Sequence, residues 1–295
     1  MKRFSVFLAA LLFLLSFSFS ACAEEAETPH YTLPVDFSPG LPVDQRYYLS
    51  DTVYEDPTLK VTITTGDSNG VLYWIADIEI QDASQLRTAA ANSFRSQGSE
   101  YGSVLAKRMN AVLAVDGDYY CYSRGVPLTI RQGVVFKNEL RHMRGHDILL
   151  IDENGDFHCL VNPTEKDVKK VLKKHTIINA FYFGPVLVND GEICTSTSTS
   201  LNPTQYSQRV AIAQTGHLKY RVIVTGPHKR GSKAFQFEDW RSFVAEMKDI
   251  RCAYNLDGGD SAVLVFNSRK VNDPKNNNER QLADIIYFAS AWPGD

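Results

Sequence analysis

The chain has 295 residues, and its 31 Lys and Arg nearly balance its 34 Asp and Glu, which leaves a formal net charge of −3. The charge is mildly acidic and no run of basic residues interrupts it, so nucleic acid is excluded as an expected partner. A chain of this length can bury a large core in one big domain or two modest ones.

The first segment, residues 1–23, has the pattern of a secretory signal peptide. Lys2 and Arg3 precede an apolar stretch, and small residues at its end offer a cleavage site. We therefore expect a secreted or extracytoplasmic protein without a stable membrane span, because no later stretch reaches the roughly 20 apolar residues that a spanning helix needs. A cell-surface lipoprotein anchored through Cys22 is the less favoured alternative, since Phe19 is a poor fit three residues upstream.

Residues 24–53 carry acidic residues and prolines but few apolar runs, which predicts an irregular N-terminal arm or tether. Regular structure is expected from Tyr54 onward, so residues 54–295 would form one large domain. Alternating apolar and polar residues predict half-buried strands, and short continuous apolar runs predict fully buried ones. In chain order the expected strands are 59–64, 71–80, 111–115, 127–130, 134–137, 147–152, 209–213, 219–225, 262–267 and 283–289. Residues 177–188 are apolar and aromatic, with a break at Gly184-Pro185.

Helical character is found in residues 104–109, 164–174 and 238–248. Thr164 is the expected N-cap of the second helix, where acidic residues come first and lysines last, as the helix dipole favours. Many short strands with only a few helices predict an α+β domain, with mixed, largely antiparallel sheets and a few packing helices, rather than regular βαβ units.

The cysteines Cys121, Cys159, Cys194 and Cys252 contain no C-x-x-C pair, so neither a zinc ribbon nor a redox motif is indicated. Export permits disulfides, and the sequence favours no particular pairing. His142 and His146 have a spacing that would suit a metal on a helix, but a strand is expected directly after them, so we interpret them as a surface pair.

Two turns combine carboxylates with glycine at the end of a buried strand. One is Asp116-Gly117-Asp118, and the other is Asp257-Gly258-Gly259-Asp260, followed by Ser261. Glycine allows close approach of the backbone to a ligand, and a carboxylate there can act as acid, base, nucleophile or metal ligand. An ordinary strand-ending turn is the alternative for both, since Asp and Gly are common turn residues.

These turns belong to a series of sequence blocks that covers roughly residues 105–290. The blocks are Ala114–Tyr120, Pro127–Gly133, Phe183–Val188, Gln208–Ile212, Asn255–Ser261 and Glu279–Tyr287. In this order and spacing they resemble the phosphodiester glycosidase family. Bacterial members of that family are often described as exported, exopolysaccharide-related proteins.

The resemblance implies a hydrolase that cleaves the sugar–phosphate C–O bond of a sugar-1-phosphate diester on a phosphorylated cell-surface or extracellular glycan. Such cleavage passes through an oxocarbenium-like state, which a carboxylate can stabilise or trap, while arginine suits the leaving phosphate. The expected catalytic residues are Asp257, then Asp118, then Asp116. The expected substrate- or phosphate-binding residues are Arg209, Arg280, Gly258, Gly259, Ser261, Asp260 and Gly117.

The chain departs from the family pattern in both turns. The family usually has Asn at the position of Asp116, and a third glycine and a serine pair where this chain has Asp260-Ser261-Ala262. No cofactor is expected, but the added carboxylates leave open a bound divalent cation. Two alternative functions also stay open: a metal-assisted phosphodiesterase that cleaves the P–O bond, and a non-catalytic glycan-binding module on the same fold.

Overall fold

The computed structural model of the chain describes residues 29–96, 98–118, 126–143, 145–196, 202–226, 233–272 and 279–294. The predicted signal segment, with Cys22, and Cys121 lie outside these residues. In the described part of the chain, no helix has the length and hydropathy that a membrane span requires.

The described residues form three large sheets and one two-stranded sheet, and every strand pairing among them is antiparallel. The nine-stranded sheet has the order β1 (Tyr48–Ser50), β2 (Val53–Glu55), β3 (Leu59–Ser68), β4 (Val71–Ile80), β16 (Lys219–Thr225), β15 (Val210–Gly216), β17 (Cys252–Asn255), β13 (Val186–Asn189) and β14 (Glu192–Ile193).

The two smaller sheets have five strands each. One, here called the β10 sheet, has the order β11 (Phe157–Leu160), β10 (Ile148–Asp152), β12 (Ile177–Phe181), β8 (Leu128–Arg131) and β9 (Val134–Asn138). The other, here called the β7 sheet, has the order β19 (Arg269–Lys270), β18 (Leu264–Phe266), β7 (Ala111–Asp116), β21 (Asp284–Ala289) and β5 (Leu86–Ala90). A separate pair is formed by β20 (Gln281–Leu282) and β6 (Glu100–Tyr101).

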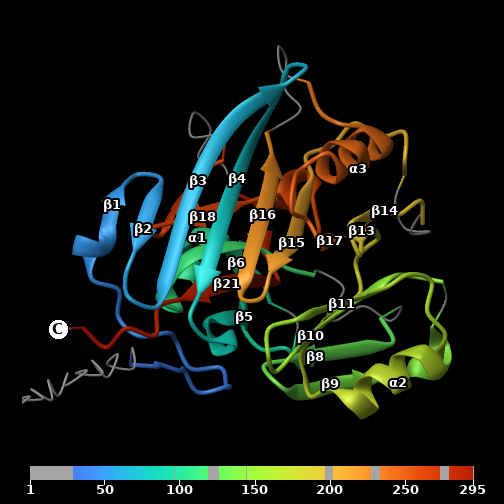
Figure 1. Cartoon of the computed structure of the whole chain (residues 1–295), viewed down its shortest axis with the longest axis horizontal. Coiled ribbons are helices and arrows are strands. Elements are labelled where there is room, and N and C mark those ends of the chain that lie inside the picture. Colours follow the sequence, from blue (N-terminus) through green and yellow to red (C-terminus); the bar gives the residue numbers. More distant parts are fainter. Residues whose placement is uncertain are drawn as a thin grey trace, which may run out of the picture.

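The inner faces of the three sheets share one hydrophobic core. Val222 of β16, Leu149 of β10 and Ile286 of β21 are all fully buried in it. The nine-stranded sheet lies in front of the β7 sheet in Figure 1, and the β10 sheet lies beside it at the lower right. The alternating burial along β3 and β4 follows from this arrangement, because only one face of those strands meets the core.

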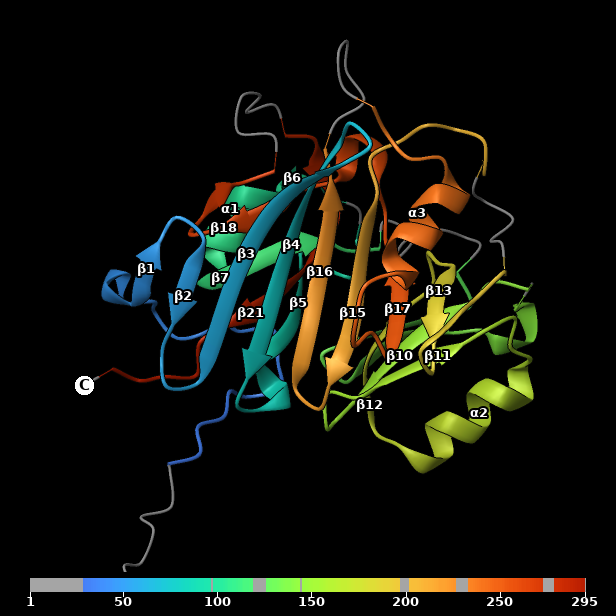
Figure 2. The same ribbon diagram turned by 45° about the horizontal axis from the view of Figure 1, so that its top comes forward.

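Each helix covers the outer face of a different sheet. Leu105 of α1 (Gly102–Arg108) packs against the β7 sheet, Val168 of α2 (Glu165–Lys174) against the β10 sheet, and Trp240 of α3 (Phe237–Ala245) against the nine-stranded sheet. Figure 2 shows α2 and α3 on separate outer faces. The sheets are therefore buried on both sides where a helix covers them, which explains the continuous apolar runs of β7 and β21.

The predicted α+β class with largely antiparallel sheets is confirmed, and the three helices lie where the sequence places them. Thr164 caps α2 with a reciprocal capping box to Asp167. Regular structure begins earlier than the expected start at Tyr54. A short 3-10 helix at Gln45–Tyr47 and strand β1 precede that residue. The division of the chain at residue 53 itself stays a prediction.

Strand β5 was not expected, because Arg87 and Thr88 make its sequence look polar. Both side chains are nevertheless buried. The Arg87 guanidinium donates to the carbonyls of Pro34 (2.7 Å), Asp36 (3.0 Å) and Ser38 (3.0 Å). The N-terminal arm thus supplies the acceptors that a buried guanidinium requires.

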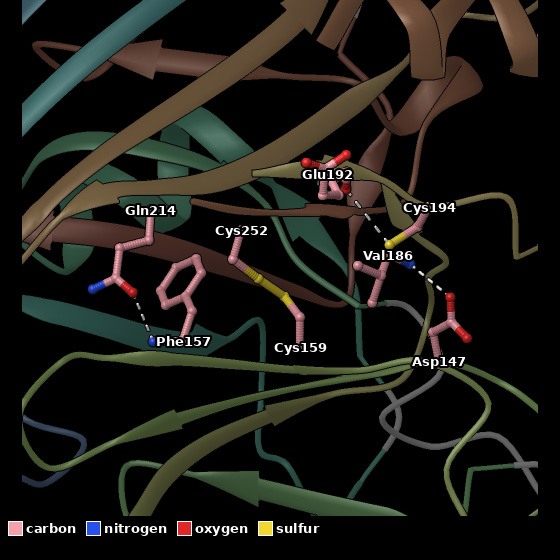
Figure 3. The surroundings of a disulfide bond; sticks show 8 residues. All are labelled: Asp147, Phe157, Cys159, Val186, Glu192, Cys194, Gln214 and Cys252. Atoms are coloured by element: carbon pink, nitrogen blue, oxygen red, sulfur yellow. Dashed lines mark hydrogen bonds between the residues drawn. A yellow bond between two sulfur atoms is a disulfide. The ribbon is translucent and has the colours of Figure 1, made fainter. Parts of the chain in front are cut away.

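A disulfide between Cys159 of β11 and Cys252 of β17 joins the β10 sheet to the nine-stranded sheet, and Cys194 is a free thiol. Figure 3 shows the bond between the two sheets, with Gln214 on one side of it and Asp147 on the other. The Gln214 side chain accepts from the Phe157 amide at 3.0 Å, so a hydrogen bond and a covalent bond cross the same junction.

Replacing both bonded cysteines, Cys159→Ala with Cys252→Ala, is expected to lower the free energy of unfolding by about 2–5 kcal/mol, because the bond closes a long loop. The two cysteines are 93 positions apart. Denaturant unfolding under non-reducing conditions measures the change. Cys194→Ala is the control and should unfold like the unchanged protein; equal midpoints for all three proteins would contradict the prediction.

Candidate active site

Strand pairing brings the two acidic turns together. In the β7 sheet Asp116 is in register with Ile285, so Asp284 at the start of β21 lies beside the turn that ends β7. Asp257 lies two residues after β17, and the amide of Leu256 between them donates to the Val210 carbonyl of β15. The ends of strands from two different sheets therefore meet at one place.

A cavity of about 450 Å³ lies at this meeting point. Its lining residues are Gly98, Ser99, Asp116, Gly117, Asp257, Ser261, Arg280, Gln281, Leu282, Ala283 and Asp284. Five of the ten residues predicted from the sequence are among them: Asp116, Gly117, Asp257, Ser261 and Arg280.

Asp257 is held by its own turn. Its Oδ1 accepts from the Gly258 amide at 2.8 Å, and the Ser261 hydroxyl also hydrogen-bonds to this carboxyl. Burial raises the pKa of Asp257 to about 6, although those hydrogen bonds and the nearby Arg280 charge act to lower it. Arg280 Nη1 in turn donates to Ser261 Oγ at 3.4 Å. A carboxyl with this pKa can exchange a proton near neutral pH.

Two further carboxyls reach the cavity from the β7 sheet. Asp116 is buried, and its Oδ1 accepts from the Val263 amide at 3.4 Å, while Oδ2 has no hydrogen-bond partner among the described residues. Burial and the neighbouring Asp257 charge raise the pKa of Asp116 well above its usual value. Burial also raises the pKa of Asp284 to about 7, against the opposing effect of Arg131.

Behind the cavity lies a buried ion cluster. Arg131 Nη2 is 3.4 Å from Asp284 Oδ2 and 4.0 Å from Asp118 Oδ2. The Asp118 amide donates to Asp284 Oδ1 at 3.0 Å, and Asp118 Oδ2 accepts from the Tyr182 amide at 2.7 Å. Asp118 therefore lies in the supporting layer rather than in the cavity lining, and its predicted role as a base stays a prediction.

The comparisons with known proteins agree with the geometry. The sequence profile of the phosphodiester glycosidase family matches residues 109–289. The chain belongs to this family. It is a glycosidase-type hydrolase, as the sequence blocks predict. No curated protein sequence is detectably similar to it.

Solved structures share its fold. The catalytic domain of zebrafish N-acetylglucosamine-1-phosphodiester alpha-N-acetylglucosaminidase, auto-inhibited by its pro-peptide, is similar with a TM-score of 0.61 and 17% identity, over 91% of this chain and 99% of that one. A hypothetical protein from Synechocystis has a TM-score of 0.52 and 12% identity, over 81% of this chain and 64% of that one.

The other predicted residues of this phosphodiester glycosidase lie around the cavity without lining it. The Arg209 guanidinium lies 5.4 Å from the centre of the Phe237 ring and donates to the Gln205 carbonyl at 2.8 Å. Burial lowers the pKa of Arg209 to about 10. Asp260 is exposed on the short 3-10 helix Gly259–Ser261.

Gly258 and Gly259 are each required for a separate physical reason. At Gly258 an added Cβ would lie 2.6 Å from the Gln208 carbonyl oxygen, so the turn approaches β15 too closely for a side chain. Gly259 has a φ of +60°, which favours glycine. The turn that presents Asp257 therefore depends on both positions.

Sequence reasoning missed Asp284 and Arg131 as site residues, although both stand within the quoted blocks. The signal used was a carboxylate beside a glycine turn. Asp284 has no glycine next to it, and Arg131, although it precedes the Gln132-Gly133 turn, is not a carboxylate. The available signal was a charged residue within an otherwise apolar strand, because such a residue is buried only when it is paired.

Gly117→Ala is expected to damage the site, because the new Cβ would lie 2.8 Å from Cγ and Oδ1 of Asp284. The Asp284 carboxyl is hydrogen-bonded and cannot move freely, so we expect a stability loss of about 1–3 kcal/mol and at least a tenfold loss of turnover. Thermal unfolding and turnover measure the two effects. Gly216→Ala is the control, since the nearest atom to its added Cβ is 3.7 Å away; equal behaviour of both variants would contradict the model of close approach.

Asp257 should make the stability depend on pH. Its folded pKa of about 6 lies above its ordinary value of 3.8, so its contribution to stability is fully present below the unfolded pKa and is lost as the pH rises through about 6. Asp257→Asn removes this titration. The free energy of unfolding should then fall less steeply between about pH 4 and about pH 7, by roughly 1–3 kcal/mol.

Denaturant unfolding across this pH range measures the slope. Gly216→Ala changes no titratable group and should keep the slope of the unchanged protein. An unchanged slope in the Asp257 variant would show that this carboxyl titrates as in the unfolded chain.

Proposed function

We propose that the protein is an exported hydrolase that cleaves the C–O bond between a sugar and a phosphodiester on a cell-surface or extracellular glycan. The family supplies the glycosidase chemistry. The observation that carries the finer proposal is the shared cavity wall of Asp257 and Arg280, connected through the Ser261 hydroxyl. It combines a carboxyl suited to a sugar cation with a guanidinium suited to a phosphate.

Asp257 is the proposed catalytic carboxyl. In its ionised form it stabilises or traps the positive charge that develops on the sugar as the C–O bond breaks. Its pKa of about 6 leaves a substantial ionised fraction near neutral pH. Because the departing phosphate monoester is already a stable anion, strong protonation of the leaving group is less important here than in ordinary glycoside hydrolysis.

Arg280 is the proposed phosphate ligand. It lines the cavity, is exposed, and uses only one described hydrogen bond, to Ser261. The planar guanidinium can form two parallel hydrogen bonds to phosphate oxygens. Arg209 is proposed to act indirectly, since its Cα would lie 3.7 Å from a Cβ at Gly258 while its guanidinium packs on Phe237.

Export is proposed from the signal pattern in residues 1–23 together with the disulfide. A disulfide forms and persists in an oxidising compartment outside the cytoplasm, and Cys159–Cys252 is such a bond. The substrate would then be a phosphorylated glycan at or beyond the cell surface.

Turnover of a panel of sugar-1-phosphate diesters tests the residue roles. Asp257→Asn should lower kcat by about 10²–10⁴-fold, and Arg280→Ala should lower kcat/KM by roughly 10²-fold. Asp239→Asn, which changes an exposed carboxylate of α3 outside the cavity, is the matched control and should keep most of the activity. Wild-type turnover in the Asp257 variant would exclude it as the catalytic carboxyl, and a larger effect of Arg209→Ala than of Arg280→Ala would reverse the phosphate assignment.

Hydrolysis in oxygen-18 water tests the bond that breaks. Label in the sugar hydroxyl is expected, because it marks C–O cleavage. Label in the phosphate would instead establish a phosphodiesterase that cleaves the P–O bond. Saturable glycan binding without turnover of any diester would establish the non-catalytic alternative.

A further inference from the structure

A second cluster of functional side chains lies outside the active-site cavity. It consists of Asp152 at the end of β10, His158 in β11 and His175 at the end of α2. One ligand atom from each residue lies within 4.8 Å of the other two, and among the described residues no other group of histidine, cysteine and carboxylate side chains meets this condition. None of the three residues lines the active-site cavity.

The distances within the cluster suit a small metal ion. Asp152 Oδ2 is 2.9 Å from His158 Nε2 and 3.1 Å from His175 Nδ1. In a tetrahedral zinc site with ligand bonds of about 2.0–2.1 Å, neighbouring ligand atoms are about 3.3 Å apart. Each histidine nitrogen thus needs to move away from Asp152 Oδ2 by only a few tenths of an ångström to admit the ion.

The Asp152 carboxylate is already oriented to bind a metal ion. Asp152 Oδ1 accepts from the Asn154 amide at 2.9 Å and from the Asp156 amide at 3.0 Å. This leaves Oδ2 facing the two imidazoles. A carboxylate ligand whose other oxygen is hydrogen-bonded is the usual outer-shell arrangement of metal sites.

The ligands are held by rigid elements and remain accessible. His158 is opposite Leu150 in the β10–β11 ladder, and the His175 amide donates to the Val171 carbonyl at the end of α2. The Asp152 side chain is only 2% exposed, while the histidine side chains are 22% and 23% exposed. Both histidines line an open cavity of about 550 Å³, through which an ion and a water molecule can enter.

We propose that Asp152, His158 and His175 form a zinc site, with water as the fourth ligand. Two imidazole nitrogens favour zinc or a similar transition metal over calcium or magnesium, which prefer oxygen ligands. The site connects β10 and β11 to the end of α2. His158 is adjacent to Cys159, so the ion stiffens the strand from which the disulfide reaches β17, the strand that leads to Asp257.

The test uses Zn²⁺ alone as the probe. The purified protein is stripped with a chelator, and zinc binding is measured by calorimetry and by competition with a chromogenic chelator. One equivalent should bind to the unchanged protein. Outer-shell substitutions already weaken metal binding by about 10–100-fold, so His158→Ala and His175→Ala, which remove ligands, should weaken it by roughly 100-fold or more.

His142→Ala is the matched control, because His142 is an exposed histidine that contacts Glu139 and Arg141 and lies outside the cluster. It should bind zinc like the unchanged protein. Circular dichroism of the zinc-free variants checks that they are folded. As a measurement that needs no variant, Co²⁺ bound in place of Zn²⁺ should give the visible absorption of a tetrahedral site.

Three results would overturn the proposal. They are the absence of saturable binding to the unchanged protein, equal affinity in the two ligand variants, and an equal loss in His142→Ala. The first result would leave the cluster as a hydrogen-bonded His–Asp–His group without metal. Since none of the three residues belongs to the proposed catalytic set, turnover of a diester by zinc-free protein would not bear on this outcome.

Discussion

The active site depends on one buried guanidinium. Arg131 ends β8 in the β10 sheet, and its side chain is 1% exposed. Its guanidinium contacts Asp284, the first residue of β21, and Asp118, which follows β7. It also donates to the Ala180 carbonyl of β12. A buried charge is tolerated only with such partners, so folding of Arg131 into the core requires these strand ends to meet. The cavity forms where they do.

The same constraint explains the raised pKa values. Burial disfavours ionisation of Asp116, Asp257 and Asp284. Neighbouring carboxylates add to this effect: Asp257 and Asp284 act on Asp116, and Asp118 acts on Asp257 and Asp284. Arg131 and Arg280 supply two positive charges nearby, fewer than the carboxyls that gather here. Some of these carboxyls therefore stay protonated near neutral pH, and the cavity can both accept and donate protons.

Much of the fold could be predicted because it follows local periodicity and capping. The strands of the β3–β4 hairpin and the Thr164 cap are encoded within a few neighbouring residues. The cavity-lining parts of the two glycine turns were also predicted, because glycine beside carboxylate is a local signal. Sequence patterns could not predict the partners of Arg87, the pairing of Arg131 with Asp284, or the Cys159–Cys252 bond. These contacts join residues that are far apart in the chain and meet only in the folded structure.

The departure at Asp116 from the asparagine usual in the family is smaller than the sequence suggests. Burial and the Asp257 charge raise the pKa of Asp116 well above its usual value, which favours the uncharged acid over the carboxylate. An uncharged carboxylic acid offers one acceptor and one donor oxygen, much as an asparagine amide offers an acceptor oxygen and a donor nitrogen. Oδ1 accepts from the Val263 amide, and Oδ2 has no hydrogen-bond partner among the described residues. Asp116 is one of the residues that line the cavity. In its uncharged form Asp116 therefore keeps the donor-and-acceptor character of asparagine, and it loses that character when it ionises.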